Sequence, residues 1–226
     1  MNLHSAFDLA SADRANSDLV THGTSSSHAS PLPKPLSRPS REAAEAAVKT
    51  LLAWAGDDPT RDGLRDTPKR VVDAYGDYFS GYTADAAAEL TTPFEATTAY
   101  QDMVMLRDIT VASHCEHHIA AFTGVAHVAY LPMGRIVGLS KLARVVEIYC
   151  RRLQTQENLT SMIASTITAG LQPGGVAVMI VAEHQCMSMR GVRQHGVSTI
   201  TTRFTGAFET DPSLRDRFTM LAQAPR

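Results

Sequence analysis

Four short segments rich in β-branched and aromatic residues frame two amphipathic helices, and this order constrains the fold more than any other feature. The expected strands are Met103–Val111, Phe122–Leu131, Val176–Ala182 and Val197–Phe204. Between the second and third strands, helices are expected from Ser140 to about Leu153 and from about Gln156 to Leu171. Two hairpins that bracket a helix pair predict an α+β domain, with an antiparallel four-stranded sheet and both helices on one face.

The first 40 residues have a different composition from the rest of the chain. They contain nine serines and four prolines, and their apolar residues follow no period. Such a segment buries too little apolar surface to offset the entropy of ordering it. Residues 1–40 are therefore predicted to form a disordered leader.

Residues 41–98 are predicted to be mainly helical. Ser40 is a good N-cap for a first helix, and Gly56 is a plausible stop. Thr67 is expected to cap a second helix, with Pro68 at its first position and Gly81 at its end. A last helix is expected to open at Asp211-Pro212, within the core of residues 99–226.

Charge and cysteine content exclude several classes of protein. The chain holds 21 basic and 23 acidic residues, so it lacks the positive excess of a dedicated nucleic-acid binder. Its longest apolar run, Val176 to Ala182, is far short of the ~20 residues that span a bilayer. Three cysteines form no disulfide framework. We therefore expect a cytoplasmic protein without a nucleic-acid or membrane partner.

Two of the three cysteines lie in polar clusters, His114–His118 and Glu183–Cys186. Residues three apart face the same way in a helix or turn, so Cys115 and His118 can converge on one ion, and Cys186 can complete a Cys2His set. Three protein ligands leave a fourth position open, which is typical of catalytic zinc, and thiolates favour zinc over magnesium or calcium.

The simpler interpretation is that a lone C-x-x-H spacing arises by chance and that free cysteines pack as small apolar residues. Cys150, in Ile148-Tyr149-Cys150, is expected to be such a core residue. His127 and His195 are expected to be structural. His117 and His184 remain as candidate general acids and bases.

A second group is cationic and lies at the expected start of a helix. Ser140 is expected to cap that helix, with Lys141 and Arg144 on one face, and Arg190 follows Cys186 by four residues. Helix starts and cations attract anions, although a solvated basic face is the simpler interpretation. Zinc beside such a pocket favours hydrolysis of a phosphorylated small molecule.

Several motifs in this order resemble a known family. They are Asp58-Pro59-Thr60-Arg61-Asp62-Gly63-Leu64, Thr67-Pro68-Lys69-Arg70, Cys115-Glu116-His117-His118, Gly138-Leu139-Ser140-Lys141, Gln154-Thr155-Gln156-Glu157, and His184-Gln185-Cys186-Met187 followed by Arg190-Gly191. Over roughly residues 42–222 the chain resembles the zinc-dependent GTP cyclohydrolase I family. The resemblance implies the T-fold, in which sheets from several subunits join into a barrel. It also implies a homodecamer with active sites between subunits.

The implied reaction converts GTP and water into formate and 7,8-dihydroneopterin triphosphate, at the entry to folate or tetrahydrobiopterin synthesis. The resemblance assigns zinc to Cys115, His118 and Cys186, with zinc-activated water attacking C8 of the guanine. It assigns proton transfer to His117 and His184. The candidate substrate-binding residues are Glu116, Leu139, Ser140, Lys141, Arg144, Gln156, Glu157 and Arg190.

Three other classes of protein are alternatives to a GTP cyclohydrolase I. A catalytically silent T-fold binder should have lost a ligand or a proton-transfer histidine, and none is missing. A zinc nucleobase deaminase requires a later P-C-x-x-C motif, which this sequence lacks. A structural zinc module would close its site with a fourth ligand and would leave the cationic group unexplained. The sequence therefore predicts an enzyme.

Overall fold

The computed structural model describes residues 37–92, 94–95, 100 and 102–225. These residues belong to one compact unit, Pro35–Arg226. The leader predicted for residues 1–40 thus lies almost entirely outside the described residues. Among those described, no helix is both long enough and apolar enough to cross a membrane.

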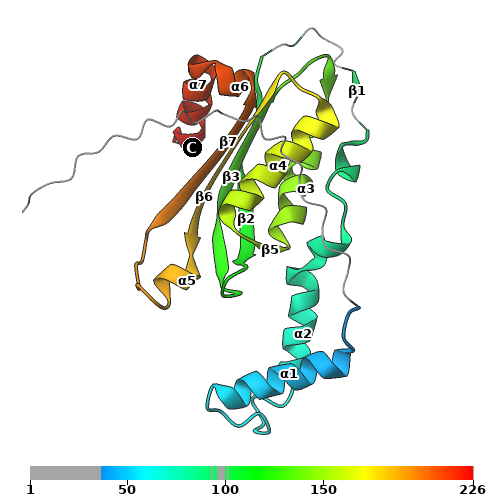
Figure 1. The fold of residues 1–226 in the computed structure, drawn as a ribbon, viewed down its shortest axis with the longest axis vertical. Coiled ribbons are helices and arrows are strands. Elements are labelled where there is room, and N and C mark those ends of the chain that lie inside the picture. Colours follow the sequence, from blue (N-terminus) through cyan, green and yellow to red (C-terminus); the bar gives the residue numbers. More distant parts are fainter. Residues whose placement is uncertain (1–36, 93, 96–99, 101, 226) are drawn as a thin grey trace, which may run out of the picture. The chain divides into compact units, whose positions relative to one another are not determined.

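The sheet contains the four expected long strands in antiparallel order (Figure 1). They are β2 (Val104–Cys115), β3 (Ala121–Leu131), β6 (Gly175–His184) and β7 (Ser198–Gly206). The spatial order is β5-β2-β3-β6-β7, in which the two-residue β5 (Leu153–Gln154) pairs in parallel with the end of β2. The predicted antiparallel four-stranded sheet is confirmed, and β5 is an addition that no sequence pattern indicated.

The two central helices cover one face of the sheet, as predicted (Figure 1). α3 (Leu139–Cys150) and α4 (Gln156–Leu171) bury one apolar stripe each against alternate residues of β3 and β6. The period of two sends Val178 and Ile180 to these helices and Met179 to the opposite face. There Met179 packs with Phe208 of α6 (Ala207–Thr210) and Phe218 of α7 (Pro212–Gln223).

The start of α3 differs from the prediction. Its N-cap is Gly138, and Ser140 occupies the second helical position instead of the cap. The chain enters the helix two residues early because the N–H of Lys141 already donates to the carbonyl of Gly138, at 2.8 Å. At the other end the helix stops at Cys150, and Leu153 belongs to β5.

The boundaries of α4 agree with the prediction. Its C-cap is Gln172, which takes the left-handed conformation at φ 48°. α7 opens as expected, with the side chain of Asp211 accepting from the N–H of Ser213 at 2.8 Å.

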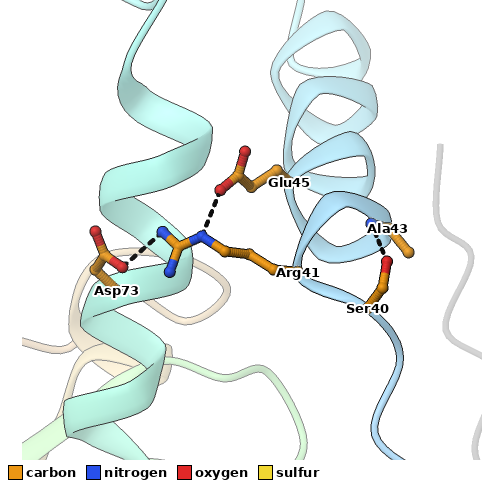
Figure 2. A network of polar contacts seen from close by, with 5 residues as sticks. All are labelled: Ser40, Arg41, Ala43, Glu45 and Asp73. Carbon is orange, nitrogen blue, oxygen red and sulfur yellow. Dashed lines mark hydrogen bonds and ion pairs between the residues drawn. The ribbon is translucent and has the colours of Figure 1, made fainter.

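Two helices precede the sheet, α1 (Arg41–Trp54) and α2 (Thr67–Tyr78). The predicted Ser40 cap is confirmed, since its hydroxyl oxygen accepts from the N–H of Ala43 at 3.2 Å (Figure 2). Figure 2 also shows Arg41 joining the helices, with its guanidinium 2.8 Å from Glu45 and 2.7 Å from Asp73.

The second helix begins and ends earlier than predicted. Asp66, not Thr67, is its N-cap, and the helix ends at Tyr78 instead of Gly81. Gly81 lies in the following 3-10 turn, η1 (Ser80–Thr83), where a Cβ would overlap the backbone oxygen of Ile148 in α3. This close approach, which only glycine allows, attaches the N-terminal helices to the core.

The remaining elements are short. They are the 3-10 turn η2 (Ala88–Leu90), the strand pair β1 (Phe94–Glu95) and β4 (Arg135–Ile136), and the one-turn helix α5 (Gln185–Ser188). Of these, η2 and α5 carry side chains that bear on the site.

Candidate active site

A tight turn at the end of β2 brings together Cys115 and His118, whose side chains carry donor atoms of the kind that bind metals. The N–H of Ile119 donates to the carbonyl of Cys115 at 2.9 Å, and the N–H of Cys115 donates to Ala120 at 2.8 Å. Ile119 accommodates the reversal in the left-handed region, at φ 54°. As a result, His118 Nδ1 lies 3.9 Å from Cys115 Sγ.

The third donor residue is Cys186 in α5, which directly follows β6. In the sheet, β6 is separated from β2 by β3 alone. Because β3 pairs with both β2 and β6, the register places His114 and His184 at the same end of the sheet. The donor atoms of Cys115, His118 and Cys186 all lie within 4.8 Å of one another. The structure thus assembles the three residues whose spacing predicted a Cys2His set.

The chemistry of these donors fits a divalent metal with an affinity for sulfur. Burial raises the pKa of the Cys186 thiol, and the neighbouring Cys115 raises it further. Two thiols at this distance oppose each other's ionisation, and a bound cation would favour both thiolates. Two sulfurs and one imidazole nitrogen are donors of the kind that bind zinc.

His184 flanks this group and is held on two sides. Its ring stacks on Phe122 with centroids 4.5 Å apart and an interplanar angle of 10°. Its Nε2 lies 2.8 Å from the amide oxygen of Gln156. Burial lowers the pKa of His184, while the charge of Glu157 opposes that shift.

His117 lies in the exposed turn, with its ring centroid 6.3 Å from that of His118. Arg190 completes this end of the site, because its guanidinium lies 3.0 Å from His118 Nε2. His117 and Arg190 thus lie beside His118, and His184 precedes Cys186 by two residues.

The other predicted cations lie elsewhere in the chain. Lys141 Nζ is 2.8 Å from a carboxylate oxygen of Glu89, in η2, and Arg144 is 3.8 Å from the same oxygen. The hydrogen bond from Lys141 lowers the pKa of Glu89. Glu89 was not predicted, because it lies 52 residues before Lys141 in no recognisable motif.

One chain does not bring the two groups of charged residues together. Lys141 is at the first turn of α3, whereas the last turn of α3 leads into β5, which pairs with Cys115. Twelve residues of helix at 1.5 Å each separate the two ends by about 18 Å. Arg190 therefore lies with the metal-type donors, and Ser140, Lys141 and Arg144 form a separate cationic group.

The remaining predicted residues divide by burial. Glu116, Leu139, Ser140 and Glu157 are exposed, whereas Gln156 is buried. Cys150 is a core residue as expected, and burial raises its pKa to about 12. His127 is also buried, and its Nδ1 accepts from the N–H of Asp108 at 3.4 Å, whereas His195 is exposed.

The fold and the site together define an α+β enzyme with a group of donors suited to a metal, carried at one end of an antiparallel sheet. Residues 44–223 match the family model described as GTP cyclohydrolase I. The chain belongs to the GTP cyclohydrolase I family.

Curated relatives agree with this assignment over most of their length. The GTP cyclohydrolase 1 of Maricaulis maris (strain MCS10) is 60% identical over 186 residues, which are 82% of this chain and 91% of that protein. The GTP cyclohydrolase 1 of Hyphomonas neptunium (strain ATCC 15444) is 58% identical over 188 residues, covering 83% and 91%. The GTP cyclohydrolase 1 of Allorhizobium ampelinum (strain ATCC BAA-846 / DSM 112012 / S4) is 57% identical over 187 residues, covering 83% and 93%.

The expected family, hydrolase class and T-fold are thereby confirmed. The reaction of the family is the conversion of GTP to 7,8-dihydroneopterin triphosphate, the first step of folate and pterin biosynthesis.

Proposed function

We propose that this chain hydrolyses GTP at C8 of the guanine, releases formate and forms 7,8-dihydroneopterin triphosphate, with zinc held by Cys115, His118 and Cys186. The observation that carries the proposal is the convergence of these three donors within 4.8 Å, beside two histidines. When bound there, zinc would supply a Lewis acid that makes water a nucleophile at neutral pH.

In this proposal, the two remaining histidines move protons during ring opening and formate release. His184 is held by Phe122 and Gln156, and His117 lies in the exposed turn. A pair of histidines in unlike surroundings suits a reaction that needs both an acid and a base.

The substrate-binding roles follow from charge and position. The carboxylate of Glu157 accepts hydrogen bonds, which matches the donor edge of guanine, and Glu116 and Leu139 are exposed where they can contact a ligand. Arg190, Ser140, Lys141 and Arg144 bind the ribose and triphosphate. Since Lys141 lies at the start of α3 and the end of this helix, about 18 Å away, leads to the strand that pairs with Cys115, we infer that two chains share one GTP site.

We therefore infer a homo-oligomer with active sites between subunits, and the family resemblance implies that it is a decamer. The sheet supports this, since in the described part of the chain β5 pairs only with the last two residues of β2 and β7 pairs only with β6. Two long sheet edges are thereby left for neighbouring copies, and a closed ring would pair them.

We also propose that the enzyme is cytoplasmic. Residues 41–98 would form its helical N-terminal part, and residues 99–226 its catalytic core. Cys115, Cys150 and Cys186 are all free thiols, a state typical of a reducing compartment.

Formate release from GTP is the direct test. The purified protein is incubated with GTP before and after treatment with a zinc chelator, and zinc or magnesium is then added back. We expect formate before treatment, none after it, and recovery with zinc alone. Bound zinc without formate would contradict the reaction, and formate that persists after zinc is removed would contradict the role of the metal.

Lys141→Ala should weaken the binding of GTP more than that of guanosine. Loss of one cation from a triphosphate site costs on the order of 1 to 3 kcal/mol for a charge-assisted hydrogen bond, or roughly 5- to 150-fold in affinity. Glu89→Gln should instead strengthen the binding of GTP, since it removes the carboxylate that competes with the triphosphate for Lys141.

Calorimetry on the zinc-loaded enzyme measures the affinities for GTP and guanosine. The control is Lys49→Ala, on the exposed side of α1. Equal losses for GTP and guanosine in Lys141→Ala would contradict the triphosphate assignment.

A further inference from the structure

Gln156, the first residue of α4, lies between β6, β7 and His184, and its side chain is buried. Its Nε2 is 3.1 Å from the carbonyl of Ile180 and 2.9 Å from that of Thr199. Backbone carbonyls only accept, so this end of the amide is the NH2 group and the other end is the oxygen. The amide oxygen lies 2.8 Å from His184 Nε2, and therefore Nε2 carries a hydrogen and donates it.

Two threonines hold this amide in a single orientation. Thr160 donates its only hydroxyl hydrogen to the backbone carbonyl of Gln156, at 2.7 Å. The 2.7 Å contact between the hydroxyls of Thr160 and Thr201 therefore uses the hydrogen of Thr201. The oxygen of Thr201 then accepts from Gln156 Nε2 at 3.1 Å. That nitrogen has two hydrogens for three acceptors, so Thr201 shares a hydrogen with the backbone carbonyls. Every hydrogen bond in the network has one possible direction.

The same network leaves one nitrogen of His184 available. Phe122 fixes the plane of the ring, and Gln156 fixes the Nε2 corner within that plane. Nε2 keeps its hydrogen whether the ring is neutral or charged. Among the described residues, none makes a hydrogen bond with Nδ1, so this nitrogen is open to a ligand.

We propose that Thr201, through Thr160 and Gln156, is a positioning residue that holds the hydrogen of His184 on Nε2 and presents Nδ1 to the reacting guanine. This rests on the proton-transfer role of His184 in the proposed function. It adds to the role predicted for Gln156, because both ends of its amide are engaged by the protein: the residue orients a catalytic histidine.

Thr201→Val tests the proposal, since it removes the hydroxyl and keeps the shape of the side chain. We expect kcat to fall about tenfold or more, because small misplacements of a catalytic group cost up to about 100-fold. KM for GTP and zinc content should stay at the wild-type level, and Thr201→Ser should recover most of the loss. Gln156→Met removes the acceptor for His184 and should lower kcat in the same way.

Thr205→Val is the matched control. Thr205 lies on the same strand, accepts from the N–H of Val176 at 3.1 Å and contacts Thr168 of α4 at 3.2 Å. It is a similar threonine pair between β7 and α4, away from His184, so this variant should keep the wild-type kcat.

The same substitution in a variant that already lacks His184 separates positioning from a general structural effect. In His184→Ala, adding Thr201→Val should cause no further loss of the residual turnover, since residues that act as a unit are not additive. An unchanged kcat in Thr201→Val, or an equal loss in both backgrounds, would overturn the positioning role alone. A wild-type protein that releases no formate from GTP would instead overturn the proposed function, and this role with it.

Discussion

Cys186→Ser is expected to abolish metal binding and formate release together. Two donors would remain where three converge within 4.8 Å, and a serine hydroxyl is a poor substitute for a thiolate at neutral pH. Loss of partners outside the ligand shell already costs 10- to 100-fold in metal affinity or activity, so loss of a ligand should cost at least about 100-fold. Metal analysis of the purified variant and the formate assay measure the two effects.

The matched control is Cys150→Ala, because Cys150 is the other free cysteine of the core outside the donor set. It should keep the metal and turn over GTP, with a loss of thermal stability only. A Cys186→Ser protein that retains stoichiometric metal would show that Cys186 is not a ligand.

His117→Ala is expected to separate metal binding from catalysis. Since the donor set contains His118 and not His117, the variant should retain its metal. Turnover should fall by about 10²- to 10⁴-fold, the usual contribution of a positioned acid or base. The measurements are metal content, GTP affinity and single-turnover formate release.

His195→Ala replaces another exposed histidine and should leave all three quantities near the wild-type values. If His117→Ala loses its metal, the assignment of ligand and acid–base roles within the turn is wrong.

Local sequence signals predicted those elements whose ends depend on local chemistry. α4 starts where expected, because Thr155 caps it by accepting from the N–H of Asn158, at 3.2 Å. Its other end also lies where expected. Ser40 and Asp211 succeeded as caps for the same reason.

Elements that depend on tertiary pairing were missed. β2 was expected to stop at Val111. It continues to Cys115, since β3 on one side and β5 on the other supply partners for its last residues. Ser140 failed as a cap because Gly138 had already begun the turn.

The site shows the same division. The donors Cys115 and His118 follow from a spacing of three. The contacts of Glu89 with Lys141 and of Thr201 with Gln156 arise only through the fold. Gln156 stays a predicted substrate-binding residue. What the sequence could not show is that both ends of its amide contact the protein, at the carbonyl of Thr199 and at Nε2 of His184.

The length of α3 between its two functional ends has a genetic consequence. In an oligomer whose sites are shared between copies, a chain damaged at Cys186 still offers intact cations at Lys141 to its neighbour. A chain damaged at Lys141 likewise still offers intact donors. If the proposed oligomer forms, two inactive alleles of this kind expressed in the same cell would assemble mixed rings in which some sites receive both intact ends, and each allele would rescue the other.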